Sequence, residues 1–504
     1  MRVHHGFMVA ACVWMGAACG GGQSTDGSAD LVTRPMDGLI DRTVAPPPGD
    51  PRPFALPGVT ETTLDNGLRV VVVERPSFPT IALRLTVRAG HDATDGRPEV
   101  AELTTRVLRD GADRSDAAAI ARRLDVLGMR YTASTQPNRV VLAMDGLATS
   151  AREASALLAN LARRPHLDPE RIEARRDEYA DELEVNAAQP SFHRQRLMRR
   201  VLFGDHVYGQ TASPDAVRAV TADEVRAHHA STWGPNRATL YIVGAIDDDA
   251  LDAILANFAG WDATTEPWAA PEPPVVTTCN EAHVVVRPDS AQTSVAWVGP
   301  SPTRDDDGWF DALVANQVVG GGPSARLFMH LREERSYTYG AYSRPMHYAG
   351  LSIITSTSDV RGDVTHEALD AFVEEWDRAH NETIPDNELT DARDYLSGIL
   401  PIELERNGPL AGYVSDLVDS ELGVAFLDGY RDAVAGVTAE GASAAASDLF
   451  GRDDLTLIMV GEREVAIPAA QAHASVVHVY DLDGALVETL DGALDSTCPT
   501  PFVR

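Results

Sequence analysis

The chain has 504 residues, of which 44% are hydrophobic, and it carries 43 basic against 75 acidic side chains, a formal net charge of −32. It is too long for a single core and apolar enough to fold, so we expect two or three domains. Every basic residue except histidine is arginine, because the sequence contains no lysine. The acidic balance argues against a nucleic-acid partner, since phosphate binding needs basic surface. A solvated acidic surface explains the charge and identifies no partner.

The first 19 residues have the pattern of an export signal. Arg2 precedes an apolar stretch from Phe7 to Ala18, and small residues lead to Cys19 and a run of glycines. This pattern resembles a bacterial lipoprotein signal, with ordinary secretion and an incidental Cys19 as the alternative. No later apolar run approaches the roughly 20 residues of a membrane span. We therefore expect a lipid on Cys19 as the only membrane anchor, with the mature chain in the cell envelope facing the periplasm.

After the signal, predicted elements follow in chain order. Residues 20–57 are rich in Gly, Ser, Asp and Pro, which predicts a disordered tether. The turn Asp65-Asn66-Gly67 then introduces apolar and alternating runs that are typical of strands at 68–73 and 81–87. Further strands are expected at 139–145 and 239–244, and helices at 98–109, 115–128, 150–163, 168–187 and 222–232, with Ser115, Ser150 and Thr221 as capping candidates.

A second proline-rich break, residues 263–278, separates two similar halves. The sequence Val71–Pro76 before the break resembles Val284–Pro288 after it. One repeat with a spacing this long indicates duplicated domains rather than a solenoid. We expect a signal peptide at 1–19, a tether at 20–57, domains at 58–262 and 279–465 joined by the linker 263–278, and a C-terminal tail at 466–504 that is irregular apart from a short apolar run at 476–480.

Export leaves two cysteines in an oxidising compartment, because Cys12 is removed with the signal and Cys19 is lipidated. Cys279 and Cys498 have no Cys-x-x-Cys neighbour. We therefore predict a disulfide between Cys279 and Cys498 that fastens the tail to the second domain, in preference to a metal site.

Short stretches, each weak alone, recur in a fixed order and spacing over residues 58–465. They are Leu64–Val70, Ala89-Gly90, Leu124–Gly128, Pro235-Asn236 before Leu240–Gly244, Gly320–Phe328, Leu331–Glu333 and Tyr339. Together they resemble the insulinase, pitrilysin and mitochondrial-processing-peptidase family. The resemblance implies an α+β fold of two homologous domains, each an antiparallel sheet covered by helices, as in the mitochondrial-processing-peptidase-like metallohydrolase fold.

Active members of that family carry an inverted zinc motif, His-x-x-Glu-His, on the first long helix. Positions i and i+4 put two imidazoles on one face, and the glutamate between them can polarise the metal-bound water. In this chain Glu102 and Arg106 stand at the two histidine positions and Thr105 stands at the position of the base. Because a guanidinium cannot coordinate a cation, the resemblance implies no catalytic residues and no zinc in this chain.

The third zinc ligand of the family is a glutamate on a later helix, and Glu182, eight residues before Pro190, matches that position. We expect Glu182 to pair with Arg106, so that neither charge is buried singly. The alternative is a solvated carboxylate on the helix face.

Other motifs give no second reactive centre. None of the 15 histidines has another four residues further on, so surface or core histidines are expected rather than a zinc site elsewhere. The glycines at 320–322 lack the lysine of a phosphate-binding loop.

Arg332 and Tyr339 match an arginine and a tyrosine that family members present from the C-terminal domain toward the zinc site of the opposing domain. In that role they would bind a peptide carbonyl near the metal. The alternative is that both are structural parts of a junction between a helix and a strand.

The resemblance therefore implies the non-catalytic subunit of a heterodimeric zinc metallopeptidase. Its partner would be a catalytic subunit of the same family, which alone holds zinc, and its ligand would be a peptide substrate. The alternative is a non-enzymatic cell-envelope scaffold or peptide-binding lipoprotein. An independent peptidase is less favoured, because no Ser-His-Asp, Cys-His or paired-acid pattern is present.

Overall fold

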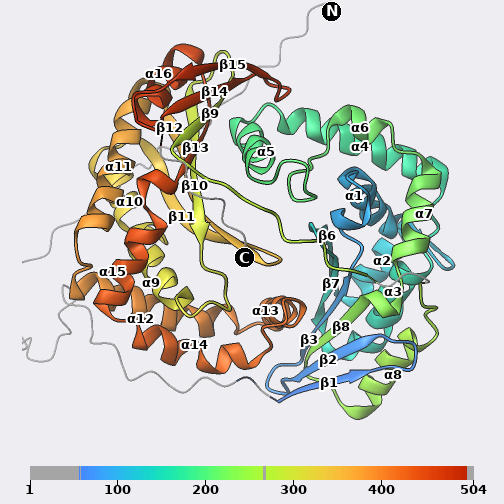
Figure 1. Cartoon of the computed structure of the whole chain (residues 1–504). Coiled ribbons are helices and arrows are strands. Elements are labelled where there is room, and N and C mark those ends of the chain that lie inside the picture. The colour runs from blue at the N-terminus through green and yellow to red at the C-terminus, as the bar shows by residue number, and fades with distance from the viewer. Residues whose placement is uncertain (1–55, 57, 265–267, 497–504) are drawn as a thin grey trace, which may run out of the picture. The chain divides into compact units, whose positions relative to one another are not determined.

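Two sheets, one in each half of the chain, organise the fold (Figure 1). The computed structural model describes residues 56, 58–264 and 268–496. The predicted signal peptide, almost all of the predicted tether, the lipidation site Cys19 and the cysteine Cys498 lie outside the described residues.

The first sheet has six strands in the order β1-β2-β8-β3-β7-β6. Its neighbours are antiparallel except for β2 and β8, which run parallel. The strands are β1 (Val59–Thr63), β2 (Arg69–Glu74), β3 (Thr80–Val87), β6 (Arg130–Thr135), β7 (Val140–Leu147) and β8 (Ala238–Gly244), while β4 (Gly111–Ala112) and β5 (Ser115–Asp116) pair separately. The helices of this half are α1 (Pro98–Val107), α2 (Ala117–Leu127), α3 (Ala151–Arg163), α4 (Pro169–Asn186), α5 (Pro190–Phe203), α6 (Pro214–Arg218), α7 (Ala222–Thr232) and α8 (Asp248–Ala259).

The second sheet has seven strands in the order β11-β12-β10-β13-β9-β14-β15, and β9 runs parallel to both of its neighbours. The strands are β9 (Glu281–Val286), β10 (Gln292–Ser301), β11 (Thr338–Tyr348), β12 (Leu351–Arg361), β13 (Thr456–Gly461), β14 (Val476–Tyr480) and β15 (Leu486–Asp491). The helices are α9 (Trp309–Val319), α10 (Arg326–Phe328), a π-helical turn (Met329–Glu334), α11 (Thr365–Asn381), α12 (Asp386–Glu403), α13 (Asn407–Asp419), α14 (Ala425–Gly436), α15 (Ala439–Leu449) and α16 (Arg463–His473). The predicted fold class, two α+β domains with mainly antiparallel sheets covered by helices, is confirmed.

Each sheet is covered on both faces, which explains the unbroken apolar run of β2. Val70 and Val72 pack with α2, α3 and α8 of the same half. Val71 and Val73 point to the other face and pack against apolar residues of α12, α13 and α14 from the second half. A strand buried on both faces reads as a continuous apolar run, because both side-chain directions need an apolar residue.

The covering helices are exchanged between the halves. Helix α5 belongs to the first half in sequence, but its residues Leu197, Met198, Leu202 and Phe203 pack on the second sheet. Helix α13 belongs to the second half and lies on β3 and β8 of the first sheet. Each half thus supplies helices for one face of its own sheet and covers the far face of the other sheet as well.

A buried ionic cluster fixes α13 to the first sheet. Nη1 of Arg139, just before β7, lies 2.6 Å from Oδ2 of Asp419 at the end of α13, and the same guanidinium also pairs with Asp416. The phenol of Tyr241 in β8 donates a hydrogen bond of 2.6 Å to Oδ1 of Asp419. Burial alone would lower the pKa of Arg139, but the charges of Asp419 and Asp416 raise it, so the guanidinium stays charged.

Two of the three predicted capping side chains, those of Ser115 and Ser150, do not cap their helices, although Ser150 stands at the N-cap position of α3. The side chain of Asp116, rather than that of Ser115, accepts a hydrogen bond from the backbone of Ala119 and caps α2. The hydroxyl of Ser150 donates to the carbonyl of Leu127 and makes no cap for α3. Thr221 caps α7 in a reciprocal capping box with Glu224, as predicted.

We expected an irregular tail from residue 466, apart from the apolar run at 476–480, but the structure shows regular elements there. Helix α16 extends to His473, β14 pairs in parallel with β9, and β15 pairs with β14. These strands extend the second sheet because alternate residues of β14, such as Val477 and Val479, are buried against its core. In the part of the chain that the structure describes, every helix is too short or too polar to cross a membrane.

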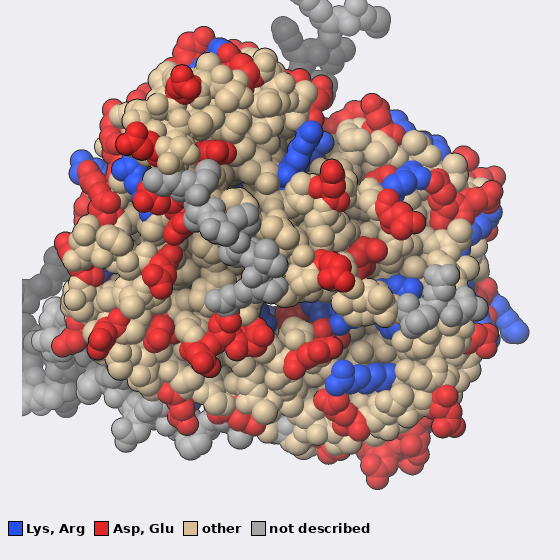
Figure 2. Space-filling model, viewed as in Figure 1, with Lys and Arg blue, Asp and Glu red and all other residues tan. Residues whose placement is uncertain are grey.

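The surface agrees with the composition. Acidic side chains are spread over the face shown in Figure 2, with arginines scattered between them. They do not gather into one patch on this face, as expected of a generally solvated acidic surface.

Candidate functional site

The segment at the zinc-motif position lies on α1, packed against α4. Helix α1 begins at Pro98, where the missing N–H and the fixed φ of proline suit the first helical turn. The hydroxyls of Thr104 and Thr105 donate to the carbonyls of Val100 and Ala101 one turn earlier, so these buried polar groups are satisfied within the helix.

Arg106 binds both carboxylates of this site. Its Nε donates to Oε1 of Glu102 at 2.8 Å, one turn earlier on α1, and its Nη1 donates to Oε2 of Glu182 on α4 at 2.7 Å. The guanidinium also lies 4.2 Å from the ring centroid of Tyr179, one turn before Glu182. The expected pair of Arg106 and Glu182 is therefore present.

The electrostatics of this pair differ in one respect from expectation. We expected both charges to be buried. Arg106 is partly buried, but Glu182 is exposed. Burial would lower the pKa of Arg106, but the hydrogen bond to Glu182 and the negative charges of Glu102 and Glu182 raise it. The guanidinium therefore stays charged, and stacking on Tyr179 adds a cation–π contribution.

These residues do not fit a zinc ion. The oxygens of Glu102 and Glu182 are bound to a permanent cation, which would repel a second one, and no imidazole stands at the position. Thr105 cannot replace the general base, because its hydroxyl donates to Ala101 and accepts from Thr135. The site can hold α1 against α4, but it has no group that activates water.

Arg332 and Tyr339 lie in the second half, at a junction between the π-helical turn and β11. Arg332 pairs with Glu333, and its guanidinium lies 4.9 Å from the ring centroid of Phe328. Tyr339 is 89% exposed, and no hydrogen bond or ion pair holds its phenol within the described residues. Strand β11 is an edge of the second sheet. No hydrogen bond or ion pair joins Arg332 or Tyr339 to the Arg106 cluster in the described part of the chain.

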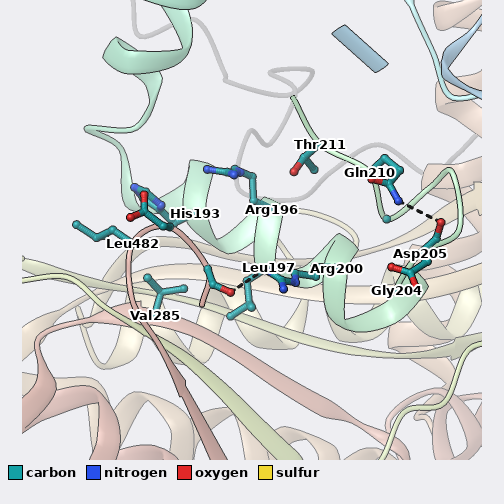
Figure 3. Close-up of a pocket in the computed structure, with 13 residues that line it drawn as sticks. His193, Arg196, Leu197, Arg200, Gly204, Asp205, Gln210, Thr211, Val285 and Leu482 are labelled. Carbon is teal, nitrogen blue, oxygen red and sulfur yellow. Dashed lines mark hydrogen bonds between the residues drawn. The ribbon is translucent and has the colours of Figure 1, made fainter. Parts of the chain in front are cut away.

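A cavity lies elsewhere, between α5 and the turn that joins β14 to β15 (Figure 3). It has a volume of about 410 Å³, and its walls carry Arg196 and Arg200 from α5 beside Asp483. Nη1 of Arg200 donates to the carbonyl of Gly484 at 2.7 Å, which ties α5 to the turn. Charges of both signs line the cavity, and it has no nucleophile beside a base.

Sequence reasoning missed one cluster with ligand chemistry. Glu281, His283 and His478 each offer one metal-ligating atom, and these atoms lie within 4.8 Å of one another. They come together because β14 pairs with β9 in parallel, with His478 opposite His283. A search for histidines four residues apart could not find residues that are almost 200 positions apart in the sequence.

Of the predicted disulfide, only one end is described. Cys279 is disulfide-bonded. Cys498 lies outside the described residues, so the pairing of Cys279 with Cys498 stays a prediction.

Comparisons with known proteins place this geometry in context. The family model for insulinase (peptidase family M16) matches residues 69–215, and the model for the peptidase M16 inactive domain matches residues 219–396. An uncharacterized zinc protease of Streptomyces coelicolor is 24% identical over 405 residues, covering 78% of this chain and 88% of that protein.

Two solved structures have the same fold. A peptidase M16 inactive domain from Pseudomonas fluorescens has a TM-score of 0.73 at 23% identity, covering 80% of this chain and 98% of that one. A protease from Helicobacter pylori also has a TM-score of 0.73, at 16% identity, covering 81% of this chain and 100% of that one.

Proposed function

Because the chain belongs to the insulinase family, peptidase family M16, we propose that it acts as the non-catalytic subunit of a two-subunit zinc metallopeptidase. It binds no zinc at the α1 position and contributes Arg332 and Tyr339 to a peptide held at the zinc site of a catalytic partner. The observation that carries the proposal is Arg106, which binds Glu102 and Glu182 where the family motif would bind metal.

The chemistry of the α1 site supports the non-catalytic half of this proposal. Hydrolysis of a peptide by a zinc enzyme needs an open metal position for water and a base to accept its proton. Here the two carboxylates hold a guanidinium, and Thr105 is buried with its hydroxyl engaged. An ion pair of this kind keeps α1 and α4 together after the metal ligands have been replaced.

The surroundings of Tyr339 support the peptide-binding half. A large aromatic side chain that is almost fully exposed, with a phenol that has no partner in the described residues, is available to another molecule. It lies on an edge strand, whose free backbone groups can pair with an extended peptide. A phenol and a guanidinium are donors that can stabilise the negative charge developing on a scissile carbonyl.

The proposal includes a cell-envelope location. Residues 1–19 act as the export signal, the lipid on Cys19 is the only membrane anchor, and a disulfide between Cys279 and Cys498 forms after export. The catalytic zinc of the complex is held by the partner alone.

The test uses the complex as it occurs in its host. A tagged chain is co-purified with a partner that carries the intact His-x-x-Glu-His motif, and peptide cleavage by the pair is measured. Replacing Arg332 with alanine or Tyr339 with phenylalanine should leave the complex intact and reduce the rate by on the order of 10²-fold, the usual effect of losing a transition-state donor.

The matched controls are Arg335→Ala, which removes an arginine next to the same turn, and Tyr342→Phe, which removes a phenol from the same strand. Both should leave the rate unchanged. If Arg332→Ala and Tyr339→Phe also leave it unchanged in an intact complex, the residues are structural, and the envelope scaffold becomes the better account.

A further inference from the structure

Three side chains with metal-ligand chemistry share one face of the second sheet. Glu281 and His283 are two residues apart on β9 and therefore point to the same side. His478 on β14 is paired with His283 across the parallel ladder. The two imidazole rings are stacked with centroids 4.8 Å apart, and Nε2 of His478 lies 3.4 Å from Oε2 of Glu281.

We propose that Glu281, His283 and His478 bind a first-row divalent transition-metal ion, with Zn²⁺ as the best match. Two imidazoles and one carboxylate form a donor set that suits zinc and is a poor match for magnesium or calcium, which take oxygen ligands. Three protein ligands leave a fourth position for water. This site is separate from the α1 position and needs no catalytic partner.

The spacing is close to what coordination requires. Ligand atoms about 2.1 Å from a tetrahedral zinc lie roughly 3.4 Å from one another. Glu281 and His478 already have this separation, and the three ligand atoms lie within 4.8 Å. Side-chain movements of about 1.5 Å therefore complete the site without a change in the backbone ladder.

One nitrogen of each imidazole is also hydrogen-bonded, as is usual for metal-binding histidines. Nδ1 of His283 lies 2.9 Å from the hydroxyl of Tyr480, and Nδ1 of His478 lies 3.3 Å from the hydroxyl of Thr489. Such outer hydrogen bonds fix the ring orientation and leave Nε2 as the ligand nitrogen. Tyr480 and Thr489 come from β14 and β15, so the cluster draws on all three strands at this edge of the sheet.

The position of the site gives the ion a structural role. Strands β14 and β15 form the last hairpin of the second sheet and attach to it through β9. A metal between β9 and β14 cross-links residues that are almost 200 positions apart in the sequence. It would therefore stabilise the docking of the C-terminal hairpin, because an ion that binds only the folded arrangement adds its binding free energy to folding.

The experiment measures metal binding by the full chain without a partner. After removal of metal with a chelator, Zn²⁺ is titrated by calorimetry, and Co²⁺ is added to a second sample to detect tetrahedral coordination by absorption. We expect one ion per chain and a rise in Tm with zinc, because an ion that binds only the folded state stabilises it.

Variants assign the ion to its ligands. His478→Ala, at a partly buried position, should weaken zinc binding at least 10-fold and abolish the zinc-dependent rise in Tm. Tyr480→Phe should weaken binding less, through the outer hydrogen bond. His366→Ala, which removes an exposed histidine from the same half, and Glu182→Gln, at the α1 site, should leave binding unchanged.

Two results would overturn the proposal. One is a wild-type chain that binds no more zinc than the His283→Ala/His478→Ala double variant. The other is binding that His478→Ala leaves intact or that Glu182→Gln removes. Circular dichroism of each variant confirms that the fold is kept, and if His283→Ala unfolds, His478→Ala alone decides the question.

Discussion

The ionic cluster around Asp419 should be a main determinant of how α13 is held on the first sheet. Arg139 is 9% exposed and the side chain of Asp419 is 6% exposed, so neither charge is solvated. At 2.6 Å and an effective dielectric constant of about 20, their attraction is about 6 kcal/mol before desolvation. Removing one partner of such a pair leaves a buried charge and typically costs about 3 to 5 kcal/mol.

The perturbation is Asp419→Asn, which keeps the side-chain volume and leaves Arg139 with Asp416 alone. We expect the free energy of unfolding to fall by about 3 kcal/mol or more. Because a chain of this size need not unfold in one step, urea denaturation is combined with amide hydrogen exchange of α13, which reports local opening directly. The α13 amides should exchange much faster in the variant.

Two variants separate the contributions. Asp416→Asn, at a side chain 46% exposed, should cost at most about 1 kcal/mol, because solvent screens that pair. Tyr241→Phe removes only the hydrogen bond to Asp419 and should cost about 1 kcal/mol. The reasoning is refuted if Asp419→Asn costs no more than Asp416→Asn, or if exchange in α13 is unchanged.

Further predictions concern the α1 site, pH and the cysteines. Replacing Arg106 with alanine should lower the free energy of unfolding by about 1 to 2 kcal/mol, because two partly exposed ion pairs and one ring contact are lost. It should create no peptidase activity. Equal urea midpoints for the wild type and the variant would contradict the stability prediction. Burial lowers the pKa of His228 and of His229 to about 4, so the unfolded chain binds more protons between pH 6.5 and 4, and stability should fall as the pH is lowered through this range. Urea midpoints that stay constant from pH 7 to 5 would count against this. Cys279 and Cys498 should resist thiol labelling in unreduced, denatured, exported protein, and labelling of both would disprove their bridge.

Features carried by local pattern could be predicted from the sequence. The apolar run Val70–Val73 identified β2, and helical spacing placed α1 and α4 within a residue or two of their ends. The pairing of Arg106 with Glu182 could be predicted because the family resemblance assigns both positions to one site, on two helices that face each other.

Features that depend on residues distant in the sequence could not be predicted in this way. Helix α5 was not predicted, because arginines stand among its few apolar residues, Leu197, Met198, Leu202 and Phe203, which pack on a sheet formed by the other half of the chain. The histidine cluster depends on a parallel pairing between β9 and β14, and no periodicity within either strand reveals it. The cap of α2 was displaced by one residue because serine and aspartate stand side by side and both can accept the backbone hydrogen bond.

The exchange of α5 and α13 means that the boundary between the halves in the sequence is not the boundary in space. A fragment that ends in the linker would display the valines of β2 without the helix that covers them, and the complementary fragment would lack the cover for β10 and β13. Separate fragments would have to associate in a bimolecular step before these faces were covered. The intact chain avoids this search, because a covalent connection holds the missing helix at an effective concentration on the order of millimolar.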